Sequence, residues 1–242
     1  MVLILFVTAK MNSMRTNADV ALIIPVYNEA QVIKSVVNNA LKYIPFVVCV
    51  DDGSRDKSSE KISQTNALLV KHPINLGQGA ALQTGIEYSL QFPHIKYFVT
   101  FDADGQHDIH DVVTMLEVIE KERLDIVLGS RFLGMVKNIS GGNRAMLKLA
   151  IRFTNVFSGV KLTDTHNGLR VFNRDFANKI NISMPDMAHA SEIIDKMGKG
   201  TWKYKEVPIT ISYSDYSRAK GQSMVNSVNI LFDLFLSKAG RK

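Results

Sequence analysis

The chain has 242 residues, and 46% of them are hydrophobic, so it can bury one large core. Its formal charge of +6 favours anionic partners, such as nucleic acid, a phosphorylated small molecule or an acidic membrane surface. No run approaches the roughly 20 apolar residues of a membrane span, and no Lys/Arg stripe is interleaved with aromatic residues. The sequence therefore argues against a transmembrane helix and against nucleic-acid binding.

The N-terminal segment, residues 1–18, has no pattern that assigns a role to it. Its short apolar run is followed by no clear signal-peptide cleavage site, and Met14 is an alternative start. The single cysteine, Cys49, lies in an apolar run and has no partner for an internal disulfide. A reducing, cytoplasmic location is therefore expected.

Apolar segments rich in β-branched residues alternate with helical patterns through the first half of the chain. Strands are expected over residues 20–24, 46–50, 67–71, 97–101 and 125–128. Helices with one apolar face are expected over residues 32–41 and 109–119. We expect Asn28 to cap the first helix, with Gln31 completing a capping box. This alternation predicts an α/β fold, with a mostly parallel central sheet and helices on both faces.

After Gly129 the regular alternation of predicted strands and helices ends. Helices are expected over residues 144–157 and 188–197, and strands over residues 169–172 and 202–211. No linker separates these elements from the first half, so they should build the second side of a cleft. Residues 224–242 predict a basic, amphipathic helix, which would lie on an anionic membrane surface, on the protein's own core or on a second copy of the chain.

Two carboxylates and an amide follow the strand expected at residues 97–101. Asp102, Asp104 and Gln106 are spaced to project together from an extended segment, although such acidic pairs also occur in solvated turns. All-oxygen ligands suit Mg²⁺ or Mn²⁺ better than zinc. An EF-hand is excluded, because counting from Asp102 puts His107 where the loop requires glycine and Val113 where it requires glutamate.

Polar residues also follow the first two expected strands. Residues 25–29 read Pro-Val-Tyr-Asn-Glu and residues 51–54 read Asp-Asp-Gly-Ser, and each alone fits an ordinary turn. In open α/β sheets, ligands bind at the carboxyl ends of the strands. Three such ends together predict a site where acceptors meet a nucleotide's base and ribose, and where a metal meets its diphosphate.

Five motifs occur in the order I-P-V-Y-N-E, V-D-D-G-S-R-D-K-S, N-L-G-Q-G-A-A-L, F-D-A-D-G-Q-H and G-S-R-F. They resemble those of family 2 glycosyltransferases of the GT-A fold, a family that includes dolichol-phosphate mannose synthase-like and bacterial cell-surface polysaccharide enzymes. The resemblance covers residues 20–223. It implies a domain over residues 19–223, with a nucleotide-binding half at 19–130 and an acceptor-side half at 131–223.

The resemblance implies inverting transfer of a sugar from a UDP- or GDP-sugar, assisted by Mg²⁺ or Mn²⁺. The residues that it places around the donor are Pro25, Tyr27, Glu29, Val50, Asp52, Asp102, Ala103, Gln106 and Arg131. It places the metal on Asp102, Asp104 and Gln106. Charge that builds up on the departing diphosphate would be stabilised by the cation and by Arg131.

Catalytic roles are expected for Asp104 and Glu192. A neutral hydroxyl acceptor needs a general base, and the resemblance implies a carboxylate after the acceptor loop, for which Glu192 is the candidate. The alternative is an ordinary solvated glutamate on a helix. A phosphate acceptor has a second pKa of about 6, so it is already largely ionised at neutral pH. Such an acceptor needs cationic side chains to guide it more than it needs a base.

The resemblance places Arg170, Arg218 and Lys220 on the phosphate and acceptor side. Residues 164–170, D-T-H-N-G-L-R, are similar to the family's D-x-x-S/C-G-F-R segment beside the acceptor opening. Two departures leave the acceptor open. Met224 replaces the lysine of the R-x-x-G-x-S-K pattern, and Gln78 stands where many relatives have lysine.

The resemblance therefore allows several functions. The first is transfer to a lipid-linked or saccharide acceptor in cell-surface polysaccharide or glycolipid assembly, with the enzyme cytoplasmic or peripheral on the inner membrane face. The second is synthesis of a polyprenyl-phosphate sugar. A catalytically inactive nucleotide-sugar-binding protein is a third, against which Asp102, Asp104 and Glu192 argue. A sugar-1-phosphate nucleotidyltransferase is disfavoured, because I-P-V-Y-N-E lacks the glycine-rich loop and basic residue of that class.

Overall fold

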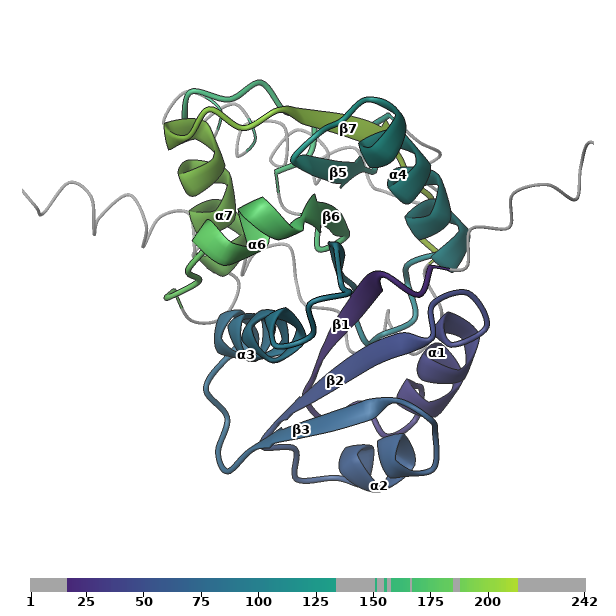
Figure 1. The fold of residues 1–242 in the computed structure, drawn as a ribbon. Helices are drawn as coiled ribbons and strands as arrows, with labels where there is room; N and C mark the ends of the chain where they lie inside the picture. The colour runs from purple at the N-terminus through teal and green to yellow at the C-terminus, as the bar shows by residue number, and fades with distance from the viewer. Residues whose placement is uncertain are drawn as a thin grey trace, which may run out of the picture.

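The computed structural model describes residues 17–133, 151, 155, 158–165, 167–184 and 188–212. Within these residues a seven-stranded sheet runs in the order β3-β2-β1-β4-β6-β5-β7 (Figure 1). The strands are β1 Val20–Val26, β2 Phe46–Asp52, β3 Leu68–His72, β4 Tyr97–Thr100, β5 Ile126–Ser130, β6 Arg170–Asn173 and β7 Tyr204–Pro208. The helices are α1 Ile33–Ala40, α2 Ser58–Ser63, α3 Gln78–Leu90, α4 Ile109–Lys121, α6 Arg174–Lys179 and α7 Ala188–Lys199.

The sheet is parallel except at β6, which runs antiparallel to both of its neighbours, β4 and β5. This arrangement confirms the predicted α/β fold with a mostly parallel sheet. Because β6 is reversed, its first residue lies beside the last residue of β4, with Arg170 in register with Thr100. The amino end of β6 therefore meets the carboxyl ends of the other strands at one edge.

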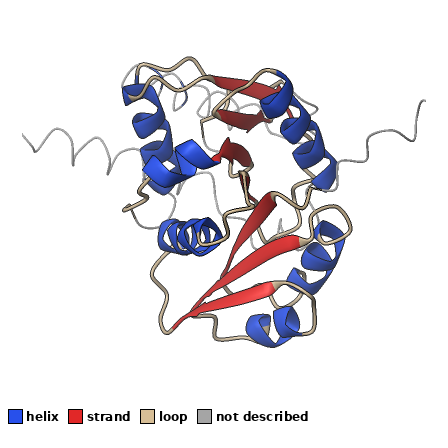
Figure 2. Cartoon of the chain, viewed as in Figure 1, coloured by secondary structure: helices blue, strands red, loops and turns tan. Residues whose placement is uncertain are grey.

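Helices cover both faces of the sheet, with α1, α2 and α4 on one side and α3, α6 and α7 on the other (Figure 2). Val37, Val112 and Leu116 pack with Val99 and Val171 on the first side. On the second side, the buried apolar residues include Leu82, Ile86, Phe172, Phe176 and Ile193. Burial on two faces explains why the central strands are continuous apolar runs rather than alternating ones.

The expected strands, and the helices over residues 32–41, 109–119 and 188–197, are confirmed with small shifts of their ends. Helices α2, α3 and α6 were not predicted. In α3, small residues face the sheet instead of a clear apolar stripe. A Cβ added to Gly85 would lie 2.4 Å from Ile23 Cγ2, so only glycine allows α3 to approach β1 this closely.

The predicted cap of α1 is wrong. The helix begins at Ile33, and its N-cap residue, Val32, makes no side-chain capping bond. Asn28 instead has a left-handed backbone, with φ of +56°, and its Oδ1 accepts a hydrogen bond from the backbone N–H of Arg55. A contact with the loop after β2 has replaced the local capping box that Gln31 would have completed.

Three sequence predictions lie outside the described residues. They are the role of residues 1–16, most of the helix over residues 144–157, and the C-terminal helix over residues 224–242. The domain boundaries remain predictions. In the described part of the chain, no helix is long and apolar enough to cross a membrane.

We expect Arg174→Met to lower the free energy of unfolding by about 2–4 kcal/mol. Its guanidinium donates to the carbonyls of Leu90, Phe92 and Ile95 where α3 ends, and the variant removes all three hydrogen bonds. The Phe92 carbonyl keeps the backbone N–H of Ile95 as a donor. Lys96→Met is the control, because it breaks only an exposed pair with Asp19 and should cost less than about 1 kcal/mol. Urea denaturation measures both losses, and equal losses would contradict the assignment.

Candidate functional site

The loops after β1 and β2 bind each other at the carboxyl edge of the sheet. The backbone N–H groups of residues 28, 29 and 30 donate to Ser54 Oγ, Ser58 Oγ and Asp56 Oδ2 at 3.0, 2.8 and 3.0 Å. Consecutive N–H groups of this kind often bind anions, but here the protein's own oxygens occupy them. Next to these hydrogen-bonded loops, Tyr27 is 40% exposed.

Asp52 ends β2 and is almost fully buried. Its Oδ1 accepts from His72 Nδ1 at 2.7 Å and from Leu76 N at 2.9 Å, and its Oδ2 accepts from Gly77 N at 2.8 Å. These bonds hold the loop over residues 73–77, which precedes α3, against the end of β2. The neighbouring Asp51 accepts from the Ser54 backbone and so shapes the turn instead.

Asp102 occupies the centre of the edge. Its carboxylate accepts hydrogen bonds from His107 Nε2 at 2.8 Å and from Gln78 Nε2 at 3.3 Å. Burial alone would raise its pKa, but the charges and hydrogen bond of His107, together with Arg170 and His189, lower that pKa overall. Asp102 is therefore held as an anion.

Gly168 is the residue that brings the loop before β6 against Asp102. A Cβ at this position would lie 2.5 Å from Asp102 Oδ2 and 2.6 Å from Oδ1, so no larger residue fits without displacing the carboxylate. The glycine of the D-T-H-N-G-L-R segment thus has a steric explanation. It joins the two halves of the domain at the Asp102 carboxylate.

Asp104 lies two residues further along the same loop, with its Oδ1 accepting from Gln106 N at 2.9 Å. Burial, and then the negative charge of Asp102, raise the pKa of Asp104 to about 6. Two oxygen-donor carboxylates that repel one another fit a hard divalent cation, which would remove the repulsion. Among the described residues, no group of three or more His, Cys, Asp and Glu side chains could hold a metal. The remaining ligands would therefore come from other groups, such as Gln106 or substrate phosphates.

Arg131, at the end of β5, is paired with Asp164. Its Nε and Nη2 donate to Oδ2 and Oδ1 of Asp164 at 2.6 and 2.8 Å, and its backbone N–H donates to Oδ2 at 3.0 Å. The Arg131 side chain is 18% exposed, whereas the Asp164 side chain is fully buried. The carboxylate therefore presents the guanidinium at the edge in a defined orientation.

Arg170 does not face the acceptor side as a solvent-exposed cation. It is 1% exposed, and its three guanidinium nitrogens have no hydrogen-bond partner among the described residues. Burial lowers its pKa to about 10, while Asp102 and Asp164 act in the opposite direction. Arg170 therefore remains a buried cation that faces these two aspartates from within the sheet.

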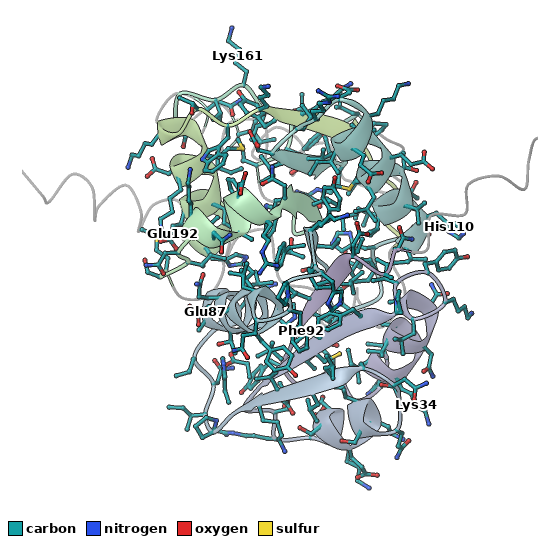
Figure 3. All side chains as sticks on the ribbon, in the orientation of Figure 1. Lys34, Glu87, Phe92, His110, Lys161 and Glu192 are labelled. Atoms are coloured by element: carbon teal, nitrogen blue, oxygen red, sulfur yellow. The ribbon has the colours of Figure 1, made fainter. Side chains whose placement is uncertain are left out.

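Glu192, on α7, is held by hydrogen bonds to one loop. Its carboxylate accepts from Ser183 N, Ser183 Oγ and Met184 N at 2.7–2.9 Å, and it pairs with Lys196 at 2.8 Å. Burial would raise its pKa, but these donors lower it overall. Figure 3 shows Glu192 on the α7 side of the molecule, opposite His110. A carboxylate with four donors and a lowered pKa is a poor general base, so the geometry argues against that predicted role.

The predicted donor residues do not all present side chains to a ligand. Pro25 lies within β1 and is buried, and Val50 is fully buried against Ala81 of α3. The side chain of Val50 therefore cannot contact a donor, and a role for Val50 at the nucleotide pocket would have to come from its backbone. Ala103 is 5% exposed and belongs to the core on the α1 and α4 side.

Sequence reasoning assigned no role to His72 or His107, which hold Asp52 and Asp102. It named Gln78 only as a departure from the family pattern. The position of His107 five residues after Asp102, within F-D-A-D-G-Q-H, was the available signal. Arg218 and Lys220 lie outside the described residues.

We expect Asp164→Asn to lower the free energy of unfolding by about 3–5 kcal/mol, because it leaves Arg131 and buried Arg170 without their shared counter-charge. Urea denaturation measures the loss. The matched control is Glu122→Gln, which breaks an exposed pair with Lys205 and should cost less than about 1 kcal/mol. A loss at Asp164 no larger than that of the control would contradict this account.

Comparison with known proteins identifies the family of the chain. The family model described as glycosyl transferase family 2 matches residues 21–180. The chain is 34% identical over 226 residues to an uncharacterized protein of Methanocaldococcus jannaschii, covering 91% of this chain and 92% of that protein. It is 30% identical over 247 residues to the UDP-N-acetylglucosamine–dolichyl-phosphate N-acetylglucosaminyltransferase of Methanococcus voltae, covering 91% and 96%.

The fold is also similar to that of a solved enzyme, glucosyl-3-phosphoglycerate synthase from Mycobacterium tuberculosis, determined in complex with Mn²⁺ and uridine-diphosphate-glucose. The TM-score is 0.68 at 14% identity, covering 96% of this chain and 81% of that one. This likeness confirms the predicted GT-A fold. With the family match and the full-length relatives, it leads to one conclusion: the chain belongs to glycosyltransferase family 2 and is a nucleotide-sugar-dependent glycosyltransferase.

Proposed function

We propose that this enzyme transfers a sugar from a UDP-sugar to a polyprenyl phosphate, with inversion at the sugar and with a divalent cation at Asp102 and Asp104. The observation that carries the proposal is the similarity to the Methanococcus voltae enzyme, which extends over nearly the full length of both chains. Its name states a UDP-sugar donor and a dolichyl-phosphate acceptor. The proposal narrows the wider set of lipid-linked and saccharide acceptors that the sequence allows.

The donor would lie across the carboxyl edge of the sheet. Tyr27 offers an exposed aromatic face to the base, and Asp52 offers an acceptor for the imide N–H of uracil. Asp102, Asp104 and Gln106 would hold the cation beside the diphosphate. When bound, a divalent cation stabilises the negative charge on a departing diphosphate.

The acceptor explains the chemistry of the other half of the site. A phosphate oxygen of the acceptor forms a bond to the anomeric carbon, and the bond from that carbon to the donor's diphosphate oxygen breaks. The electron pair of the broken bond leaves with the nucleoside diphosphate. Arg131, oriented by Asp164, is placed to attract a phosphate at the edge.

A phosphate acceptor also removes the need for a general base. Its second pKa is near about 6, so the attacking oxygen is already deprotonated at neutral pH. This agrees with a Glu192 carboxylate whose acceptor positions are taken by Ser183, Met184 and Lys196. Peripheral membrane contact through residues 224–242, a homodimer and a cytoplasmic location remain predictions from the sequence.

The acceptor is tested with purified protein, a panel of UDP-sugars and GDP-mannose, and three acceptors: undecaprenyl phosphate, dolichyl phosphate and a saccharide-pyrophosphoryl lipid. We expect transfer from a UDP-sugar to a polyprenyl phosphate, dependent on Mg²⁺ or Mn²⁺ and abolished by chelation. Transfer only to the saccharide lipid would contradict the acceptor. Absence of transfer from every donor would favour the inactive binding protein.

Asp104→Asn should lower the turnover number about 100-fold or more, because it removes an anionic oxygen ligand of the cation. The matched control is Asp108→Asn, in the same loop. Asp108 caps α4 by accepting from His110 N, and asparagine caps helices equally well. The control should retain full activity, and a comparable loss in both variants would contradict the assignment of the metal to Asp104.

Glu192→Gln should keep the turnover number within about threefold, because no base is required for an acceptor that is already ionised. It should lower the free energy of unfolding by about 1–2 kcal/mol near neutral pH, because the Gln amide N–H₂ cannot accept from the loop donors.

The stability difference has a defined pH dependence. Since folding lowers the pKa of Glu192, its stabilisation is present above the unfolded-state pKa and is lost as the pH falls through the lower folded value. The difference between wild type and variant should therefore shrink in acid. Glu87→Gln, on the exposed surface of α3 (Figure 3), is the control and should change stability by less than about 0.5 kcal/mol. A loss of activity about 100-fold or greater at unchanged stability would restore the general-base role.

A further inference from the structure

His72 is a buried histidine at the end of an edge strand. Strand β3 forms one edge of the sheet, and its first residue, Leu68, is 36% exposed. The His72 side chain, in contrast, is 9% exposed, and His72 lies in register with Asp52 at the end of β2. The imidazole is therefore turned into the protein, toward the predicted donor site.

Both ring nitrogens of His72 have partners on different elements. Nδ1 is 2.7 Å from Asp52 Oδ1, and Nε2 is 2.9 Å from Thr84 Oγ1 on α3. Because an ionised carboxylate only accepts hydrogen bonds, Nδ1 carries the proton. In the neutral ring, Nε2 then accepts from the Thr84 hydroxyl. The ring thus connects β2, β3 and α3 in one orientation.

This bond decides which acceptor of Asp52 remains open. An ionised carboxylate has two acceptor directions on each oxygen. His72 and Leu76 N occupy those of Oδ1, whereas Oδ2 of this almost fully buried side chain accepts, within the part of the chain that the structure describes, only from Gly77 N. Without His72, the carboxylate could rotate between these donors, and the position of the open acceptor would no longer be defined.

We propose that His72 is a positioning residue for donor recognition, which holds Asp52 so that Oδ2 accepts from the imide N–H of uracil. The inference rests on the proposed function, in which Asp52 faces the nucleobase. His72 does not contact the sugar or the reacting atoms. Its loss should therefore weaken nucleotide binding and raise the KM for the donor, while the turnover number at saturating donor stays near the wild-type value.

Two substitutions separate the two hydrogen bonds of the ring. His72→Asn places an amide N–H₂ where Nδ1 lies and keeps the donor to Asp52. His72→Gln reaches instead to the position of Nε2, near Thr84, and loses the bond to Asp52. The affinities for UDP and GDP are measured by calorimetry in the presence of Mn²⁺, together with KM and kcat for the UDP-sugar.

We expect His72→Gln to weaken UDP binding and raise the donor KM about tenfold, the size of effect for one hydrogen bond to a charged group. Its preference for UDP over GDP should fall, and kcat should stay within about threefold of wild type. His72→Asn should restore UDP affinity to within about threefold of wild type. Thermal unfolding without nucleotide reports the structural cost of each variant separately.

Several results would overturn the inference. They are wild-type UDP affinity in His72→Gln, equal losses in the Gln and Asn variants, or a fall in kcat at unchanged KM. If His72→Gln does not fold, Thr84→Val provides the test, because it removes only the hydroxyl that orients the ring. It should weaken UDP binding about threefold, and no change would overturn the inference. If the wild-type enzyme does not bind UDP, both the proposed function and the inference about His72 are overturned.

Discussion

The site depends on one constraint, which is that a half-buried carboxylate must remain charged at the edge of the sheet. Asp102 satisfies it with hydrogen bonds from His107 and Gln78 and with the charge of Arg170 behind it. Removing a carboxylate from much of its water without such partners would be unfavourable. The partners come from three separate parts of the chain, so this anion forms only when β4, α3 and β6 are assembled.

The same principle joins the two halves of the domain. Asp164 binds Arg131 through two side-chain hydrogen bonds and shares the charge of Arg170 with Asp102. The charges therefore alternate from the partly buried guanidinium of Arg131 to the Asp102 carboxylate. A phosphate arriving at Arg131 and a diphosphate near Asp102 would meet parts of one connected network, which suits a reaction that joins two phosphate-bearing substrates.

Histidines and a glutamate in this protein show how a titratable residue can serve structure. His72 is hydrogen-bonded to Asp52, and His107 is hydrogen-bonded to Asp102. Glu192 accepts hydrogen bonds from the loop over residues 181–184. Glu192 was a reasonable candidate for a base, because it follows the acceptor loop on a helix. Its hydrogen bonds argue against that role and support the proposed acceptor, which carries its own negative charge.

The sequence by itself determined the α/β fold, the order of the elements confirmed in the structure, the three acidic strand ends and the family. Those features follow from apolar periodicity and contiguous motifs, which are local. Only the tertiary structure decided that Val50 packs in the core, that Asn28 binds the neighbouring loop, that β6 runs in reverse and that Arg170 is buried under Asp102. Hydrogen-bonding side chains such as His72 and Glu192 find their partners across contacts between segments that are apart in the sequence. A side chain's role therefore depends on which groups the fold leaves beside it, and that information is not contained in its neighbours along the chain.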